Sequence, residues 1–290
     1  KHRYCFILGS GASVTSGVRM GRSLMLEWRN YLSEQGDVYI RECAGLLEMD
    51  EDRAVQICRS SDDPKSEDYF DLFDLRFANR AEAAFQFLEN EMYDKFPSIG
   101  YFALAAIMQQ TDIRLLLTTN FDSLTEDALY LYHGVHPLVV GHESLAGFMG
   151  SNMRRPVVAK LHRDLYYRPM NRKNEMAKLH ENWKKPLLGV LSNVTPIVVG
   201  YAGADDTLMK QLESDELQLK GIYWCVRRDS KTGKVDEPSE RVKEMVRKRD
   251  GYIVEIAGFD ECMVQMAYHF LDINQKDEPP IFQLKDPRPY

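Results

Sequence analysis

The stretch Arg114–Asp122, RLLLTTNFD, decides how the rest of the chain is interpreted. Its apolar run, Leu115 to Leu117, is typical of a strand that is buried on both faces of a parallel sheet. The run gives way abruptly to polar residues, and a helical pattern begins at Leu124. Open α/β sheets bind ligands outside the carboxyl ends of their strands, so we expect this polar cluster at a binding site.

Asn120 is the strongest candidate in the cluster, because its amide offers both a donor and an acceptor at a buried strand end. A buried amide requires hydrogen-bond partners, and capping of the next helix does not need it. Asp122 and Ser123 have a simpler interpretation as caps of that helix. We therefore predict that Asn120 is functional, while Asp122 is either a cap or part of the site.

A glycine-rich turn, Gly9–Ser13 (GSGAS), follows a short predicted strand at Tyr4–Leu8, and a helical pattern begins near Arg22. Strand, glycine turn and helix is the arrangement that lets backbone N–H groups approach a phosphate closely. The turn is not a P-loop, because no Gly-Lys-Ser/Thr follows, and it lacks the third glycine of the usual dinucleotide fingerprint. A plain tight turn between strand and helix is the alternative.

A second polar cluster follows the strand predicted over Pro156–Leu161, where His162, Arg163 and Asp164 come next. A histidine at a strand end is well placed to act as a general base. An isolated histidine would by default be a hydrogen-bonded core residue, but polar clusters at two strand ends favour a functional role. We therefore predict that His162 takes part in the chemistry.

A third turn of small residues ends the strand predicted over Pro196–Gly200 and contains Tyr201 and the tandem carboxylates Asp205 and Asp206. One of these carboxylates either caps the helix that follows or accepts a hydrogen bond from a ribose hydroxyl. The sequence favours neither interpretation over the other.

A metal site is not expected. His133, His136 and His142 lie close together in the sequence beside Glu143, but no cysteine or further acidic residue completes a known ligand pattern. The cysteines are odd in number and scattered, which fits neither a disulfide framework nor a zinc knuckle. Cys5 and Cys225 lie within strand-like runs and are most simply core thiols, and a reducing cytoplasm fits best. The five cysteines are Cys5, Cys43, Cys58, Cys225 and Cys262.

Composition is that of an ordinary globular protein, with 44% hydrophobic and 28% charged residues in a chain of 290. The net charge of -7 argues against non-specific binding to nucleic acid or to an anionic membrane. No apolar run is long enough to cross a bilayer, and no signal peptide is visible.

The order of elements predicts an α/β protein with a parallel sheet and an inserted helical module. The module is expected over residues 36–110, where amphipathic patterns follow one another without a strand-like run. A proline-rich tail, 274–290, reads as a linker that leads to further domains. The predicted strands are Tyr4–Leu8, Leu115–Leu117, Pro137–Val140, Pro156–Leu161, Pro196–Gly200, Ile222–Val226 and Tyr252–Ile256.

Taken in this order, the pieces resemble the sirtuin-like superfamily, and they are most similar to its bacterial antiphage-defence branch. The Asn-Phe-Asp and Leu-His segments are the most specific, the glycine turn is the least specific, and together the matching segments span nearly the whole chain. They are Gly9-Ser10-Gly11-Ala12-Ser13 with Ser16-Gly17, Thr118–Asp122, Lys160–His162, Val199–Gly203 and Gly258–Asp260.

The resemblance implies a Rossmann-like parallel sheet flanked by helices, with one sirtuin-like catalytic domain over residues 1–273. It implies that NAD is bound and that its nicotinamide–ribose bond is hydrolysed through an oxocarbenium-like transition state. Asn120 would orient the ribose or the attacking water, His162 would accept a proton, and Asp122 would orient the others. The NAD-binding residues implied by the resemblance are Gly9, Ser10, Gly11, Ala12, Ser13, Thr118, Gly200, Tyr201 and Asp206.

Three departures from the family keep other functions open. Arg19 stands where the family often has proline, Arg163 stands where it often has glycine, and the paired CxxC motifs of the zinc-containing deacylases are missing. An NAD-dependent protein deacylase is one alternative, and a non-catalytic module that binds NAD or ADP-ribose is another.

The expected partners follow from the expected activity. Uncontrolled loss of NAD would kill a cell, so we expect control by homo-oligomerisation or by an activating protein or phage-derived trigger. Contact with a membrane, or direct contact of this domain with nucleic acid, is not expected.

Overall fold

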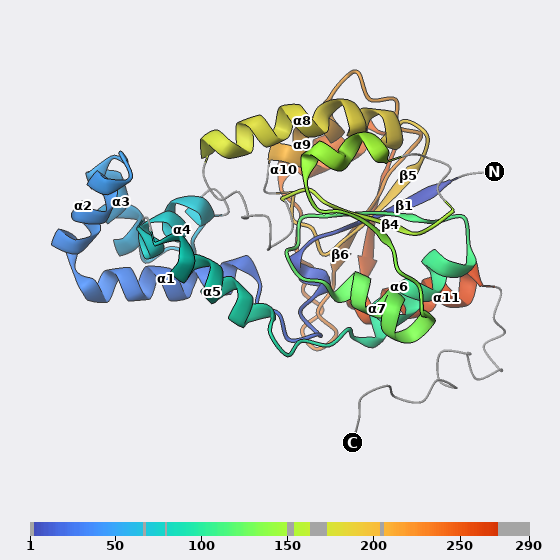
Figure 1. The fold of residues 1–290 in the computed structure, drawn as a ribbon, viewed down its shortest axis with the longest axis horizontal. Coiled ribbons are helices and arrows are strands. Elements are labelled where there is room, and N and C mark those ends of the chain that lie inside the picture. The colour runs from blue at the N-terminus through green and yellow to red at the C-terminus, as the bar shows by residue number, and fades with distance from the viewer. Residues whose placement is uncertain are drawn as a thin grey trace.

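The structure is a computed structural model that describes residues 3–65, 68–78, 80–149, 154–162, 173–203 and 206–271. In this part of the chain a seven-stranded sheet forms the centre, in the order β3-β4-β2-β1-β5-β6-β7 (Figure 1). Every neighbouring pair of strands is parallel, which confirms the predicted α/β class. The strands are β1 (Tyr4–Leu8), β2 (Leu115–Thr118), β3 (Leu138–Val140), β4 (Val157–Lys160), β5 (Thr195–Val199), β6 (Tyr223–Arg227) and β7 (Tyr252–Ile256).

The central strand β1 shows why the apolar runs form a sheet that is covered on both sides. Cys5 and Ile7 belong to the core on one face, and Phe6 and Leu8 belong to the core on the other. Successive side chains of a strand point to opposite faces, so a run that is apolar at every position must be buried on both. All five cysteines are buried free thiols, which confirms the core positions predicted for Cys5 and Cys225.

Helices cover both faces of this sheet (Figure 1). One face carries Leu104, Leu129 and Met263 from three helices, and the other carries Trp183 and Leu212 from the opposite layer. The first layer consists of α6 (Ile99–Gln110), α7 (Leu124–His133) and α11 (Phe259–Phe270), and the second of α8 (Lys173–Leu191), α9 (Asp206–Glu213) and α10 (Glu240–Lys248).

A separate helical module lies to one side of the sheet domain (Figure 1). Its core is built around Trp28, which is fully buried and contacts Tyr69, Phe73 and Phe77 edge-to-face at ring-centroid distances of 5.2, 5.3 and 6.3 Å. The helices of the module pack mainly against one another. They are α1 (Gly21–Gln35), α2 (Asp37–Leu46), α3 (Glu51–Arg59), α4 (Tyr69–Phe77) and α5 (Ala81–Met92).

The core of this module runs from Leu24 to Leu88, so it begins and ends earlier than the 36–110 expected from sequence. The helix α6 falls on the sheet side, because it is buried from Gly100 to Met108 under α11 and α7. Its N-terminus is held by Asp260 of α11, which accepts from the Ser98 hydroxyl at 2.5 Å and from the Gly100 amide at 3.1 Å. A run of helical residues does not itself show which core each helix joins.

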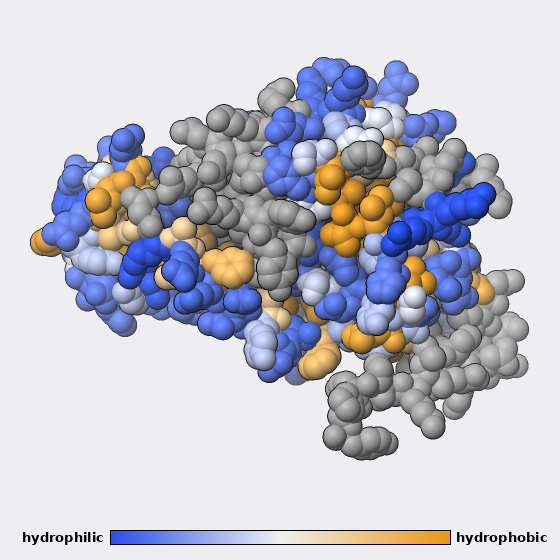
Figure 2. All heavy atoms as spheres, in the orientation of Figure 1, coloured by the Kyte–Doolittle hydropathy of each residue, from blue (hydrophilic) through white to orange (hydrophobic). Residues whose placement is uncertain are grey.

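Two chain segments join the module to the sheet domain, one before α1 and one between α5 and α6. They meet where the Ser98 amide donates to the Ser16 hydroxyl at 3.0 Å. On the face of the molecule shown in Figure 2, the described residues are mainly hydrophilic, with hydrophobic patches at the far end of the module and over the sheet domain. Val38 and Leu46 of α2 are among the exposed hydrophobic residues. No helix in the described residues is long and apolar enough to cross a membrane.

Candidate active site

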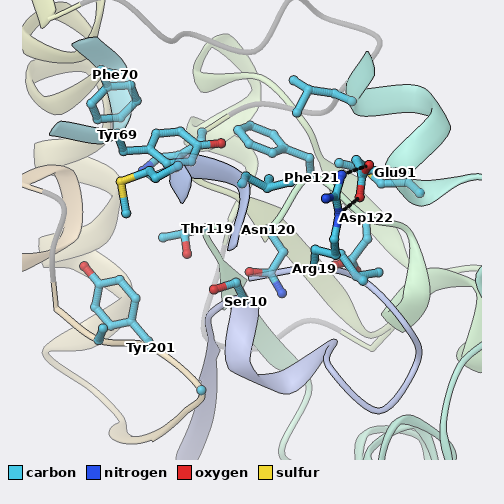
Figure 3. A pocket seen from close by; sticks show the side chains of 18 residues that line it. Ser10, Arg19, Tyr69, Phe70, Glu91, Thr119, Asn120, Phe121, Asp122 and Tyr201 are labelled. Carbon is cyan, nitrogen blue, oxygen red and sulfur yellow. Dashed lines mark hydrogen bonds and ion pairs between the residues drawn. The ribbon is translucent and has the colours of Figure 1, made fainter. Parts of the chain in front are cut away.

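A cavity of about 220 Å³ lies where the carboxyl ends of the central strands face the helical module (Figure 3). One side is polar and comes from the loops after β1, β2, β4 and β5. The other comes from α1, α4 and α5 and is apolar except for Glu91. The polar side consists of Ser10, Thr119, Asn120, Asp122, His162 and Tyr201, and the apolar side of Leu24, Met25, Tyr69, Phe70, Leu88 and Met92.

The position of this cavity follows from the strand order. From β1 the chain builds β2, β3 and β4 on one side of the sheet and β5, β6 and β7 on the other. The loops after β1 and β5 therefore flank the topological switch point, which is where open α/β sheets bind ligands. The cavity contains Ser10 from the first loop and Gly200 and Tyr201 from the second.

These two loops are in direct backbone contact, and glycines make the contact possible. A Cβ on Gly9 would lie 2.5 Å from the Tyr201 Cα, and a Cβ on Gly200 would lie 2.3 Å from the Ala12 nitrogen. The amides of Gly9 and Gly11 donate to the carbonyls of Val199 and Gly200 at 3.1 and 2.9 Å. Close approach of the two loops thus requires glycine at both positions, whether or not a phosphate lies above them.

Asn120 is held rigidly at the end of β2. The residue is 8% exposed. Its side-chain Nδ2 donates to the Gly9 carbonyl at 3.2 Å and to the Ser13 hydroxyl at 3.1 Å, and its backbone N–H donates to Thr118 Oγ1 at 3.0 Å. A buried amide that is fixed by two donated hydrogen bonds has one orientation, with its oxygen on the opposite side. The residue therefore links the glycine turn to the strand end and also lines the cavity.

Ser13 is the centre of a buried network beneath the cavity. Its hydroxyl donates to Asp122 at 2.7 Å, accepts from Asn120, and lies 2.8 Å from the Tyr101 hydroxyl. A serine hydroxyl has one donor and two acceptor sites, so Tyr101 must be the donor in its pair and the hydroxyl is fully used. Tyr101 comes from α6, which reaches the site from the helical layer below the sheet.

Asp122 completes this network and is 8% exposed. Burial raises the pKa of its carboxyl, and the hydrogen bond from Ser13 and the charge of Lys160 partly offset the rise. The carboxylate also accepts from the Leu124 amide at 3.3 Å, at the start of α7. Asp122 therefore makes the contacts of both roles considered from sequence. It bonds to the start of α7, as a helix cap would, and it also lines the cavity.

A buried cation supports the same strand ends from below. Lys160, at the end of β4, is 1% exposed, and its Nζ lies 3.0 Å from the Glu126 carboxylate and donates to the Phe121 carbonyl at 3.3 Å. Burial raises the pKa of Glu126, and the charge of Lys160 opposes that rise. The pair fixes the backbone at Phe121, whose side chain packs against the core of the helical module.

His162 follows β4 and lines the cavity together with Asn120. Its ring centroid lies 6.3 Å from that of Phe121 at an interplanar angle of 44°. Strands β2 and β4 are neighbours in register, with Thr118 opposite Lys160. An amide and an imidazole are thus delivered to one cavity by adjacent strand ends.

The residues singled out from sequence divide into those that line the cavity and those beneath it. Asn120, Asp122, His162, Ser10, Gly200 and Tyr201 line the cavity. Gly9, Gly11, Ala12, Ser13 and Thr118 lie beneath it, where the last two have buried hydroxyls. Asp206 is the first residue of α9, while Arg163 and Asp205 lie outside the described residues.

Sequence reasoning did not include several residues that line the cavity, above all those of the helical module. Tyr69 packs on the Trp28 ring in the core of the module, and Tyr69 and Phe70 also form one wall of the cavity. No sequence signal separates these two roles. Among the described residues, no group of three or more histidine, cysteine, aspartate or glutamate side chains could hold a metal ion.

The sheet, the switch-point cavity and the two covering layers define an α/β protein of the Rossmann-like class. A solved structure described as a crystal structure of a Sir2 homologue–NAD complex matches it with a TM-score of 0.50 and 14% identity, over 93% of this chain and 90% of that chain. The chain therefore has a sirtuin-like fold. No protein-family model and no curated protein sequence matches it.

Proposed function

We propose that this chain is an NAD glycohydrolase, which cleaves NAD to nicotinamide and ADP-ribose. One observation carries the proposal: Asn120 and His162 share a single cavity with the loops of the topological switch point. The sirtuin-like fold supports NAD as the substrate, because the similar structure is a complex with NAD. No metal is needed for the proposed reaction.

The two halves of the cavity suit the two demands of this reaction. Nicotinamide leaves as a neutral molecule, so the enzyme has to stabilise an oxocarbenium-like ribose and direct one water toward it. The fixed amide of Asn120 orients the ribose or the water, and His162 accepts the proton that the water loses. Asp122 and Ser13 hold Asn120 in place, and the apolar wall of Tyr69 and Phe70 excludes bulk water.

The dinucleotide would lie across the switch point, with its pyrophosphate at the glycine turn and its adenosine half along the loop after β5. Ser10 is the exposed residue of that turn, and Gly200 and Tyr201 provide the loop surface. We further propose that the enzyme belongs to the antiphage-defence type, in which a phage-derived trigger, an activating protein or homo-oligomerisation releases the activity.

Nicotinamide release from NAD by the purified full-length protein tests this function, with and without a candidate trigger. Replacing His162 with alanine should lower turnover about 10²–10⁴-fold, the usual loss for a general base. Asn120→Ala should lower turnover to a similar extent. His269→Ala, an exposed histidine on α11, is the matched control and should retain full activity. Wild-type turnover in either cavity variant would show that the chemistry lies elsewhere.

A protein deacylase is the second candidate, and the apolar wall of the cavity is the observation that favours it. Six module side chains could hold an acyl chain in place of a nicotinamide ring. An acetylated peptide separates the two functions, because a deacylase forms O-acyl-ADP-ribose and needs the peptide to release nicotinamide. Nicotinamide release without peptide supports hydrolysis. Tight NAD binding without any release would instead indicate a non-catalytic module.

A further inference from the structure

Arg19 lies at the edge of the cavity, between the glycine turn and α1, with a side chain that is 40% exposed. Its Nε donates to the Glu91 carboxylate at 2.7 Å, and its terminal nitrogens form ion pairs with Glu91 and Glu27. The Glu91 hydrogen bond is the main reason that the pKa of the guanidinium is raised. Figure 3 shows Arg19 and Glu91 joined beside Asp122 and Asn120.

The charges around the cavity are poorly matched to a dinucleotide while this ion pair is closed. Among the described residues that line the cavity, Arg19 is the one permanently charged cation, whereas Glu91 and Asp122 both carry carboxyl groups. The pyrophosphate of a dinucleotide is doubly negative at neutral pH. With Arg19 neutralised by two carboxylates, the cavity offers such a ligand no free counter-charge.

We propose that Arg19 is the side chain that binds the ligand's pyrophosphate, and that Glu91 competes with the ligand for it. The proposal rests on the proposed function, which makes the ligand a dinucleotide. A guanidinium presents the same planar pair of donors to a carboxylate and to a phosphate, so the exchange replaces one charge-assisted pair with another. The side chain is 40% exposed, so water and a ligand can reach the guanidinium.

Exchange of partners would also couple binding to the helical module. Glu91 is on α5, inside the module, while Arg19 precedes α1 and follows the glycine turn. The ion pair therefore ties the connecting segment before α1 to the last turn of α5. When a ligand binds Arg19, the ion pair with Glu91 is broken, and module positions without this ion pair become more favourable. The equilibrium between positions with and without the ion pair shifts by the difference in the ligand's affinity for them.

The test is the affinity for ADP-ribose, measured by calorimetry on the full-length protein. Replacing Arg19 with glutamine removes the counter-charge and should weaken binding about 10–100-fold, as expected for a lost charge-assisted contact. Glu91→Gln removes the main competitor, while the ion pair with Glu27 remains, and should tighten binding about 3–10-fold. The double variant should resemble Arg19→Gln. Arg41→Gln, which breaks a comparable pair with Asp52 elsewhere in the module, should leave the affinity unchanged.

The diagnostic result is that Arg19→Gln weakens ADP-ribose binding and Glu91→Gln tightens it, although both variants break the same ion pair. If the pair only holds the module in place, the two variants will shift the affinity in the same direction, and the inference fails. An unchanged affinity in Arg19→Gln, or no binding by either wild type or Glu91→Gln, also overturns it. Nicotinamide release by the wild-type protein is measured separately, so the proposed function can stand while this inference fails.

Discussion

The two sides of the cavity are held in place by different kinds of contact. On the sheet side, polar groups are fixed by buried hydrogen bonds, such as those of Ser13 with Asp122, Asn120 and Tyr101. On the module side the wall is apolar, and the ion pair of Arg19 with Glu91 is among the ties that cross to the sheet domain. Reaction chemistry requires fixed geometry, whereas admission of a ligand requires a surface that can move.

Substitution of Gly200 should give the largest effect, because it tests how tightly the sheet side is held. Gly200→Ala adds a Cβ 2.3 Å from the Ala12 nitrogen in a left-handed backbone conformation, and we expect a loss of about 3–5 kcal/mol in unfolding free energy. Urea denaturation measures it. Gly233→Ala has a similar φ of 68° with nothing within 4 Å, so it should lose about 1–2 kcal/mol through conformation alone. Equal losses would mean that the loop contact is loose.

Lys160 tests the support beneath the strand ends. Lys160→Met leaves the Glu126 carboxylate without its close partner, and breaking such a pair should cost about 2–4 kcal/mol. The double variant Lys160→Met/Glu126→Leu removes both charges and should recover to within about 1 kcal/mol of wild type. If the double variant stays as unstable as Lys160→Met, the stabilisation by Lys160 comes from its hydrogen bond to the Phe121 carbonyl and not from the ion pair.

Ser13→Ala tests whether the network positions the site. It removes a hydroxyl that three buried groups share, so we expect a loss of about 1–3 kcal/mol in stability, together with slower turnover. Ser10→Ala, at the exposed position of the same turn, should change stability by less than about 0.5 kcal/mol. Equal stability of the two variants would show that the Ser13 network contributes little.

Phe70→Ala probes the module side and should have the smallest effect. Phe70 belongs to the apolar wall of the cavity, and its ring centroid lies 5.4 Å from that of Tyr69. We expect KM for NAD to rise about 3–10-fold with kcat within about 2-fold, the pattern for a lost contact that is equal in ground and transition states. A large fall in kcat would mean that the module takes part in the chemistry and would remove the contrast between the two sides.

The fold and the position of the site were accessible from sequence for a physical reason. Uniformly apolar runs such as Leu115–Leu117 require burial on both faces, and the ends of parallel strands meet at one edge of the sheet. Asn120 and His162 were therefore predicted together from two separate segments, and the structure places both at one cavity. Their roles in catalysis stay predictions.

What sequence could not show depends on contacts between distant residues. The hydroxyl of Ser13 meets Tyr101 across 88 positions, and Arg19 meets Glu91 across 72. Neither pairing leaves a periodic or local signal. The limits of the helical module were missed for another reason. The helix α6 has no charged residue and is buried from Gly100 to Met108, unlike the amphipathic helices of the module, and it packs on the sheet. A helix that is apolar all round belongs in a core, and the prediction of the module limits did not use this difference.

The contact between the loops after β1 and β5 also restricts how this protein can change over generations. The atoms that would collide with a Cβ on Gly200 are backbone atoms of Gly11 and Ala12, and those nearest a Cβ on Gly9 include the Gly200 carbonyl. A clash between two side chains in a core can be relieved by a smaller residue opposite, but no amino-acid substitution removes a backbone atom. A screen for second-site revertants of Gly200→Ala should accordingly find no suppressor in the facing loop.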